Sequence, residues 1–222
     1  ETQLAQSAAQ QAETVQVELN SVIDGATYLR TVAAEAFIEQ KPASPEELAR
    51  YQLLDNGAYS TVDGDTDESA MFYAPFDGGV TEEEQDKASF LASIDVALHG
   101  VHHANFLVAA TYFNTRDGMT RIFPGFPIDQ VFSGTVRAQD FAFYYRADAE
   151  HFPEFDPVEN PATWTPAYVD PAQQGWIVSA IAPVYTDDVL EGVVGVDVKV
   201  KSLVGQLLSS EQVFDSHSIL LD

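Results

Sequence analysis

Residues 175–200 read GWIVSAIAPVYTDDVLEGVVGVDVKV, and they are the strongest evidence in the sequence for the fold class. Two apolar runs rich in β-branched residues, 175–185 and 190–200, flank the turn residues Thr186-Asp187-Asp188. This arrangement predicts two antiparallel strands joined by a tight turn. A second hairpin is predicted upstream, with strands at 106–115 and 119–123 around Arg116-Asp117-Gly118. An antiparallel sheet therefore forms the centre of the predicted fold.

The first forty residues predict one long helix. Its apolar positions alternate steps of three and four, a period typical of a helical seam. They are Ala5, Ala8, Ala12, Val15, Leu19, Val22, Ala26, Leu29, Ala33 and Ala36. A helix over residues 3–39 would be about 55 Å long at 1.5 Å per residue. Because a domain of this size needs no such length, we interpret the seam as a membrane stalk that also dimerises, or as half of a helical hairpin.

Shorter elements surround the predicted sheet. Ser44 is the expected N-cap of a helix opening at Pro45, and a strand is expected at 70–73. Further helices are expected at 82–104, near 139–148 and at 201–209, with the start of another strand at 218–221. A long helix followed by an antiparallel sheet with flanking helices indicates an α+β fold.

The composition excludes several classes of protein. Thirty-five Asp and Glu residues against ten Lys and Arg give a net charge of −25, so nucleic acids and anionic lipids would be repelled. The absence of cysteine excludes disulfides, thiolate catalysis and Cys-ligated zinc. No apolar run approaches the ~18–20 residues of a membrane span, and no signal peptide is recognised at residues 1–14. We therefore expect a soluble chain or an excised soluble fragment.

Three segments, in this order, carry a resemblance to a known family. They are residues 110–124 (ATYFNTRDGMTRIFP), residues 143–148 (FYYRAD) with 164–171 (WTPAYVDP), and residues 174–197, which end in GVVGVD. Together they resemble the double Cache (PAS-like) sensor domains found ahead of histidine kinases and in chemoreceptors. The resemblance covers roughly residues 50–205, and the long N-terminal helix also fits it.

The resemblance implies a domain division and a function. Residues 1–41 would be the stalk and dimerisation helix, 42–205 the membrane-distal ligand-binding module, and 206–222 the start of a truncated membrane-proximal module. The chain would then be the extracytoplasmic sensor domain of a membrane receptor, most simply a sensor histidine kinase. It would bind a small-molecule ligand, need no cofactor, perform no catalysis, and be anchored by segments outside this chain. A homodimer through the N-terminal helix is also expected.

The resemblance also implies a ligand site. Amino-acid-binding members share Arg-x-Trp-Tyr, a downstream Tyr, and the Asp that ends Gly-Val-Val-Gly-x-Asp. Aligned on Ala147, this chain has phenylalanine where the arginine stands. The candidate ligand contacts are Phe141, Phe143, Tyr144, Tyr168 and Asp197, with Trp164 and Asp170 shaping the pocket.

The phenylalanine changes the expected ligand. Arginine holds a carboxylate through two parallel hydrogen bonds, which Phe141 is unable to form. An aromatic box with one carboxylate suits an ammonium group, through cation–π contact and ion pairing. We therefore expect an amine-bearing or weakly acidic ligand in preference to a plain α-amino acid. Arg121, Arg137 or Arg146 remain alternative carboxylate clamps.

Alternative interpretations of these residues stay open. The aromatic residues could be ordinary core residues, and Asp197 could simply pair with Lys199. His99, His102 and His103 could serve a secreted metal-dependent hydrolase, although no carboxylate partner stands at the usual spacing. Residues 63–68 have the carboxylate spacing of a calcium loop without its glycine or closing glutamate, which favours a solvated turn. A purely structural dimerisation module is the remaining alternative.

Overall fold

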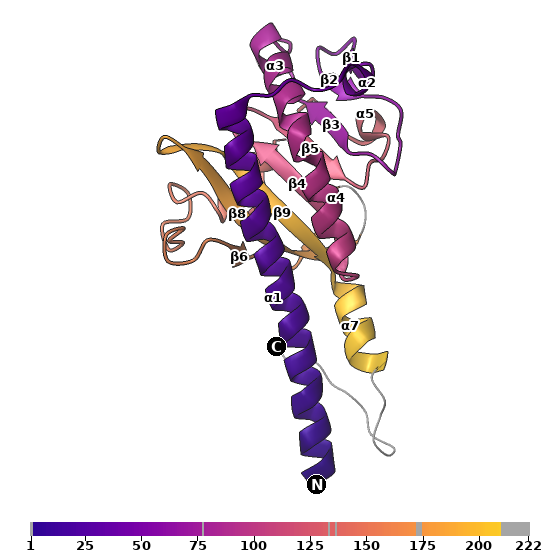
Figure 1. Ribbon diagram of the computed structural model, residues 1–222, viewed down its shortest axis with the longest axis vertical. Coiled ribbons are helices and arrows are strands. Elements are labelled where there is room, and N and C mark those ends of the chain that lie inside the picture. Colours follow the sequence, from indigo (N-terminus) through magenta and orange to yellow (C-terminus); the bar gives the residue numbers. More distant parts are fainter. Residues whose placement is uncertain (1, 77, 133, 136, 172–174, 210–222) are drawn as a thin grey trace.

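The computed structural model describes residues 2–76, 78–132, 134–135, 137–171 and 175–209. A single antiparallel sheet of nine strands crosses the domain in the order β1-β2-β3-β5-β4-β9-β8-β6, with β7 also pairing with β8 (Figure 1). The strands are β1 (Tyr51–Leu53), β2 (Tyr59–Thr61), β3 (Ala70–Tyr73), β4 (Val108–Thr115), β5 (Met119–Phe123), β6 (Thr163–Trp164), β7 (Tyr168–Val169), β8 (Trp176–Thr186) and β9 (Val189–Lys199). The α-helices are α1 (Thr2–Glu39), α2 (Pro45–Leu48), α3 (Glu82–Leu91), α4 (Asp95–Ala104), α5 (Ile128–Val131), α6 (Ala142–Tyr145) and α7 (Val200–Ser209), with 3-10 turns η1 (Ala92–Ile94) and η2 (Ala138–Asp140).

The predicted long helix is confirmed, and its seam divides into two parts. The C-terminal part, from Val22 to Ala36, is buried against β8, β9 and the α3–α4 layer. The N-terminal part extends beyond the sheet, and Ala5, Ala8 and Ala12 are exposed there (Figure 1). The seam is therefore used inside the domain over half of its length. None of the described helices combines the length and the apolar character needed to cross a membrane.

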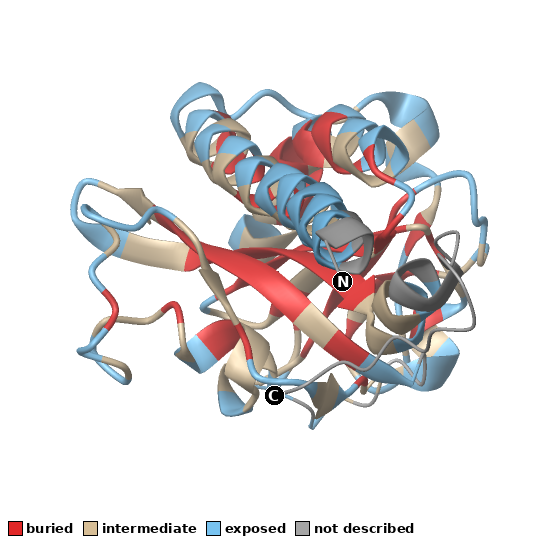
Figure 2. Cartoon of the chain, turned by 90° about the horizontal axis from the view of Figure 1, so that it is seen from below, coloured by how far each residue is buried: buried red, intermediate tan, exposed pale blue. Residues whose placement is uncertain are grey.

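Helices α1, α3 and α4 cover one face of the sheet. The main hydrophobic core lies between these helices and the sheet. It includes Leu29 and Ala33 of α1, Leu98 of α4, and Val194 and Val196 of β9. Seen from below, the buried central strands lie directly beneath the long helix, whose outer face is exposed (Figure 2). Each large aliphatic side chain buried in this way contributes about 1.5–3 kcal/mol to stability.

The opposite face of the sheet carries the connection between β5 and β8. Helix α5 and Phe132 pack on the β2–β3 end, against Phe72 and Ile122. Helix α6 packs on the β8–β9 end, where Tyr144 contacts a separate small core with Ile181. The side chains of this face therefore lie between the sheet and a long, largely irregular segment, and pockets remain between them.

A buried ion network ties the helical layer to the sheet. Arg121 of β5 is fully buried; its Nε donates to Asp95 Oδ1 at 2.6 Å, and its Nη2 donates to Glu47 Oε1 at 2.6 Å. Its Nη1 donates to the Tyr51 hydroxyl at 2.7 Å. These two carboxylates hold the pKa of Arg121 well above its usual value against the opposing effect of burial. A guanidinium this deep needs such partners, so this network fixes α2 and α4 against β5.

Most sequence-predicted elements are confirmed, with local differences. Ser44 caps α2 as expected, with its hydroxyl accepting from the Glu47 amide at 3.2 Å. The helix expected over 82–104 is interrupted by η1, which separates α3 from α4. Strands β1 and β2 were not predicted, because three-residue strands show too little alternation to be recognised. The strand expected at 218–221 lies outside the described residues.

Candidate ligand-binding site

A partly open pocket of about 60 Å³ lies between the sheet and the 132–171 segment. We call it the aromatic cavity. The described residues that line it come from β3, β4, β5 and β9 on the sheet side and from the covering segment on the other. They are Phe72, Tyr112, Asn114, Gly118, Thr120, Ile122, Phe132, Ala138, Phe141, Phe143, Tyr168, Asp170, Pro171 and Asp197. Since one water needs roughly 10–15 Å³ on this measure, the space accepts about four to five water-sized groups.

Asp197 on β9 is the buried charge of this cavity. It is only 4% exposed, and its Oδ1 accepts a 2.6 Å hydrogen bond from Ser179 Oγ on the neighbouring strand β8. Burial raises the pKa of Asp197 to about 7; the Ser179 hydrogen bond opposes this rise and the nearby Asp170 adds to it. A buried carboxyl in this state is ready to ionise when a cation arrives.

Tyr112 on β4 brings an unpaired hydroxyl to the same place. Its hydroxyl oxygen is buried and has no hydrogen-bond partner among the described residues. Burial raises the pKa of this phenol, and the charge of Asp197 raises it further. The hydroxyl nevertheless lies close enough to Asp197 to lower the pKa of that carboxyl by hydrogen bonding, so a ligand in the cavity would meet a loosely formed Tyr112–Asp197 pair.

Two positions of the GVVGVD sequence require glycine because any side chain there would clash with β4. A Cβ at Gly195 would lie 2.1 Å from Cζ of Tyr112, because the tyrosine ring lies across the strand at that position. A Cβ at Gly192 would lie 2.2 Å from the carbonyl oxygen of Asn114. The glycines therefore allow the backbone of β9 to approach β4 and let the Tyr112 ring reach the cavity.

Aromatic rings form the wall opposite the sheet. Phe141 and Phe143 stack with ring centroids 5.2 Å apart and planes 8° from parallel. The ring of Phe143 also lies 5.6 Å from Tyr168 and 5.9 Å from Tyr112. The Tyr168 hydroxyl hydrogen-bonds Ser179 Oγ at 2.7 Å and so joins the covering segment to the carboxylate. The result is a set of π-faces beside one carboxyl group, an arrangement that attracts cations.

The polar group at the β4–β5 side of the cavity is an amide. Thr120 Oγ1 donates to Asn114 Oδ1 at 2.7 Å, which leaves the amide nitrogen of Asn114 without an acceptor among the described residues. The described lining contains no lysine, arginine or histidine. The cavity thus offers a ligand carboxylate neutral donors, the Asn114 amide and the Tyr112 hydroxyl, and no cationic group.

The three arginines considered as carboxylate clamps are directed elsewhere. Arg121 lies in the ion network on the opposite face of the sheet. The guanidinium of Arg137 stacks 4.4 Å from the ring centroid of Phe76, and that of Arg146 stacks 4.4 Å from that of Phe152. None of the three belongs to the described lining of the aromatic cavity.

The structure brings five of the seven sequence-predicted site residues together. Phe141, Phe143, Tyr168, Asp170 and Asp197 all line the aromatic cavity. Asp197 bonds Ser179 there, and the alternative pairing with Lys199 is not formed.

Tyr144 and Trp164 lie outside this cavity. Successive residues of a helix point about 100° apart, so α6 turns Tyr144 away when Phe143 faces the cavity. Trp164 pairs with Ala180 in register and therefore faces the α1 side of the sheet, where it packs on the main core.

Four contributors were missed by sequence reasoning: Tyr112, Asn114, Thr120 and Ser179. The signal for two of them was present in the predicted hairpin. Ala110, Tyr112 and Asn114 alternate along β4 and pair with Asp197, Gly195 and Val193, so they share the face of the carboxylate. A large aromatic opposite a glycine is a recognisable pair once the register is known, and the register comes from the tertiary structure.

The histidine group and the acidic turn form no site within the described residues. The rings of His99 and His103 stack with centroids 4.1 Å apart beside Phe123, so their nitrogens do not converge on one point. No group of three or more histidine, aspartate or glutamate side chains in the described part of the chain is arranged to hold a metal ion. Asp63, in the acidic turn, is bound by Arg50 at 2.6 Å.

Comparison with solved structures identifies the same fold in bacterial receptors. The ligand-binding domain of the Pseudomonas aeruginosa amino acid chemoreceptor PctC, in complex with GABA, matches with a TM-score of 0.54 and 18% identity over 94% of this chain and 68% of that chain. The ligand-binding domain of PctB from the same organism matches in its L-Gln complex with a TM-score of 0.52 and 15% identity, over 95% of this chain and 60% of that chain. Its L-Arg complex matches with a TM-score of 0.50 and 16% identity, over 95% and 57%.

These domains are Cache-type sensor domains, so the fold expected from the sequence is confirmed. The chain spans about 57–68% of the length of these three domains. No protein-family profile and no curated protein matches the sequence.

Proposed function

We propose that this chain is the extracytoplasmic ligand-binding module of a transmembrane receptor and that it binds a small amine-bearing metabolite in the aromatic cavity. One observation carries the proposal: the buried Asp197 carboxyl faces a cavity walled by aromatic rings, with the Tyr112 hydroxyl beside it. An ammonium group would form an ion pair with the carboxylate, lie against the faces of the aromatic rings, and donate a hydrogen bond to the Tyr112 oxygen.

The cavity also favours one class of amine. With no cationic side chain in its described lining, it offers a ligand carboxylate only neutral donors, and ionised Asp197 would repel that carboxylate. Its volume of about 60 Å³ suits a few non-hydrogen atoms. A small amine without a carboxylate therefore fits better than an α-amino acid. The open space beside Tyr168 also argues against the structural-module alternative, which would have that space filled by side chains.

The receptor context remains part of the proposal. Residues 1–41 would connect the module to the membrane and form the homodimer seam, residues 42–205 would bind ligand, and residues 206–222 would begin a membrane-proximal module. The projecting N-terminal half of α1, with exposed Ala5 and Ala12, supports the stalk assignment. The solved domains of the same fold favour a chemoreceptor output over the histidine kinase suggested by the resemblance.

A thermal-shift comparison tests the binding proposal. Methylamine, ethanolamine and trimethylamine would be tested against glycine and acetate, on the parent chain and on Asp197→Asn. At a hundred times its dissociation constant, a bound amine adds about 2.7 kcal/mol and raises the unfolding midpoint by about 5–10 °C. The shift should be absent in Asp197→Asn. An equal shift in the variant, or none from any amine, would contradict the proposal.

A further inference from the structure

A second cavity lies on the same face of the sheet, at the β8–β9 hairpin. It has a volume of about 650 Å³, within the range of small-molecule sites, and we call it the hairpin cavity. Tyr144, Gln139 and Asp148 of the covering segment line it, together with Arg116 from the β4–β5 turn and Leu190 from the hairpin. None of these residues belongs to the aromatic cavity, so the two spaces are separate.

Tyr144 points to a ligand in this second space. The residue is only 2% exposed, yet its hydroxyl forms no hydrogen bond with any described residue. Its ring is held by Ile181 and Val193, so the hydroxyl is fixed where the side chain reaches the hairpin cavity. The ring is buried and held in place while the hydroxyl faces the hairpin cavity, so it can donate to a molecule bound there.

The groups around Tyr144 supply a second donor and an unpaired acceptor. The guanidinium of Arg116 is half exposed; its nearest ionic partner, Glu191, is 3.8 Å away, beyond hydrogen-bond distance. Gln139 Nε2 donates to the carbonyl oxygens of Thr115 and Arg116 at 3.1 and 2.9 Å, which fixes the orientation of the amide. Gln139 Oε1 is then buried with no partner among the described residues.

Positive and negative side chains lie on different sides of the hairpin cavity. Arg116 is the cationic group on the side of the β4–β5 turn. Asp140 and Asp148 bring carboxylates from the covering segment, and Asp148 already accepts from His151 Nδ1 at 2.6 Å. Donors for a carboxylate and acceptors for an ammonium group thus line one space. We infer that the hairpin cavity binds a zwitterion, a free amino acid or a short peptide, with its carboxylate at Arg116 and Tyr144 and its ammonium at Gln139 and the aspartates.

The test uses the Asp197→Asn variant as its background, so that the aromatic cavity adds no response of its own. L-Alanine and glycylglycine would be titrated separately while the backbone amide signals are followed by NMR. The expected result is saturable shifts at residues 139–148 and at Val189 and Leu190 with at least one of them; the stronger of the two identifies amino acid or peptide as the source of the zwitterion. Because this experiment does not depend on Asp197, its failure and that of the amine proposal are distinguishable.

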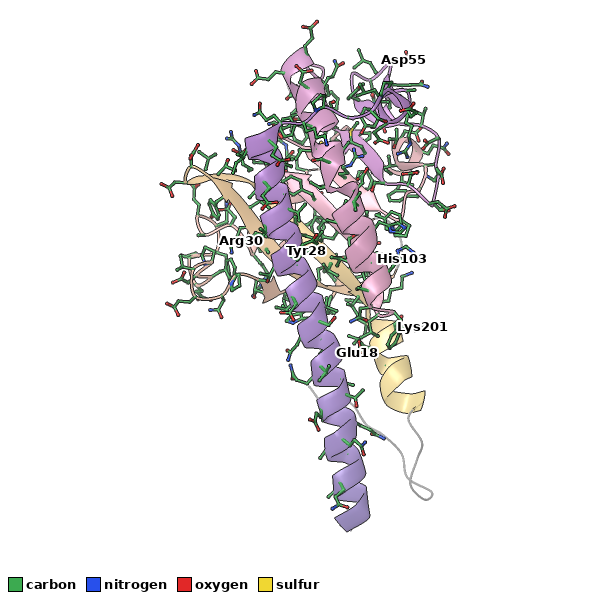
Figure 3. All side chains as sticks on the ribbon, viewed as in Figure 1. Glu18, Tyr28, Arg30, Asp55, His103 and Lys201 are labelled. Atoms are coloured by element: carbon green, nitrogen blue, oxygen red, sulfur yellow. The ribbon has the colours of Figure 1, made fainter. Side chains whose placement is uncertain are left out.

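Variants then identify the contacts. Tyr144→Phe keeps the buried ring and removes only the hydroxyl, and Arg116→Gln removes an exposed charge, so both should fold. Each should weaken binding by about tenfold, as expected for a hydrogen bond to a charged group. Lys201→Gln, which removes one exposed positive charge on α7, is the matched control and should leave the affinity unchanged (Figure 3).

Three outcomes would overturn the inference. The first is no saturable shift at the hairpin with either zwitterion. The second is an affinity unchanged by both Tyr144→Phe and Arg116→Gln. The third is equal binding of glycine methyl ester or of N-acetylglycine, because each of these keeps only one of the two charges.

Discussion

The stability of Asp197→Asn relative to the parent protein should increase as the pH rises. The ordinary pKa of this carboxyl is 3.8, and burial raises it to about 7 in the folded chain. Below pH 3.8 the group is protonated in both states and adds no pH-dependent difference. Between pH 3.8 and 7 the unfolded chain loses the proton while the folded chain keeps it, so stability falls as pH rises and levels off above about 7. Asparagine is neutral throughout and avoids this loss.

The magnitude follows from the separation of the two pKa values. One pH unit corresponds to about 1.4 kcal/mol, so the ionised carboxylate costs about 2 kcal/mol at pH 5 and about 4 kcal/mol at pH 8. The stability difference between Asp197→Asn and the parent should therefore increase by about 2–3 kcal/mol across this range. Any packing difference between the two side chains is independent of pH and leaves the slope unaffected.

Urea unfolding at pH 5, 6, 7 and 8 measures this slope. Each free energy of unfolding is obtained by linear extrapolation, for the parent and the variant in the same buffers. Asp188→Asn, in the exposed β8–β9 turn, is the control for removing one carboxylate at the surface. A difference that stays flat from pH 5 to 8, or that falls with pH, would refute the argument that Asp197 is buried without a compensating charge.

Four further results are expected. Amine affinity should rise about tenfold per pH unit up to about pH 7 and then level off, because only ionised Asp197 pairs with a cation; calorimetry at several pH values measures this. Gly195→Ala should destabilise the fold by about 1–3 kcal/mol and weaken amine binding, because the new methyl group displaces the Tyr112 ring. Arg121→Leu should cost about 3 kcal/mol in urea unfolding, since it removes the common partner of two carboxylates, and Leu29→Ala should cost about 2–5 kcal/mol by opening a cavity under α1.

The site was predicted unevenly, for reasons visible at single residues. The role of Asp197 was implied by the resemblance, and strand alternation added only that it faces away from Val194 and Val196. Tyr144 and Phe143 are neighbours in the sequence, and matching both to one site ignores the 100° between them on a helix. Trp164 lies on a two-residue strand, which is too short to show which face it occupies.

Contacts between neighbouring strands could not be predicted from the sequence, for a different reason. Tyr112 and Ser179 reach Asp197 from β4 and β8, on either side of β9. Their positions depend on the pairing register, because a slip of one residue would move every side chain to the other face. In the same way, the sequence did not predict that Arg121 faces α2 and α4, on the side of the sheet opposite the ligand site.

The long helix, the two hairpins, the α+β class and the carboxylate on β9 could be predicted from the sequence, because each depends on periodicity or on turn residues within a short stretch. Which half of the α1 seam is buried, and which aromatic rings face the carboxylate, depends on the tertiary structure. So does the separation of the two cavities by the covering segment. These outcomes depend on contacts between residues far apart in the chain, such as Tyr168 with Ser179 and Arg30 of α1 with the carbonyl oxygen of Pro157 (Figure 3). Such contacts are set by packing against the whole sheet, and no local pattern encodes them.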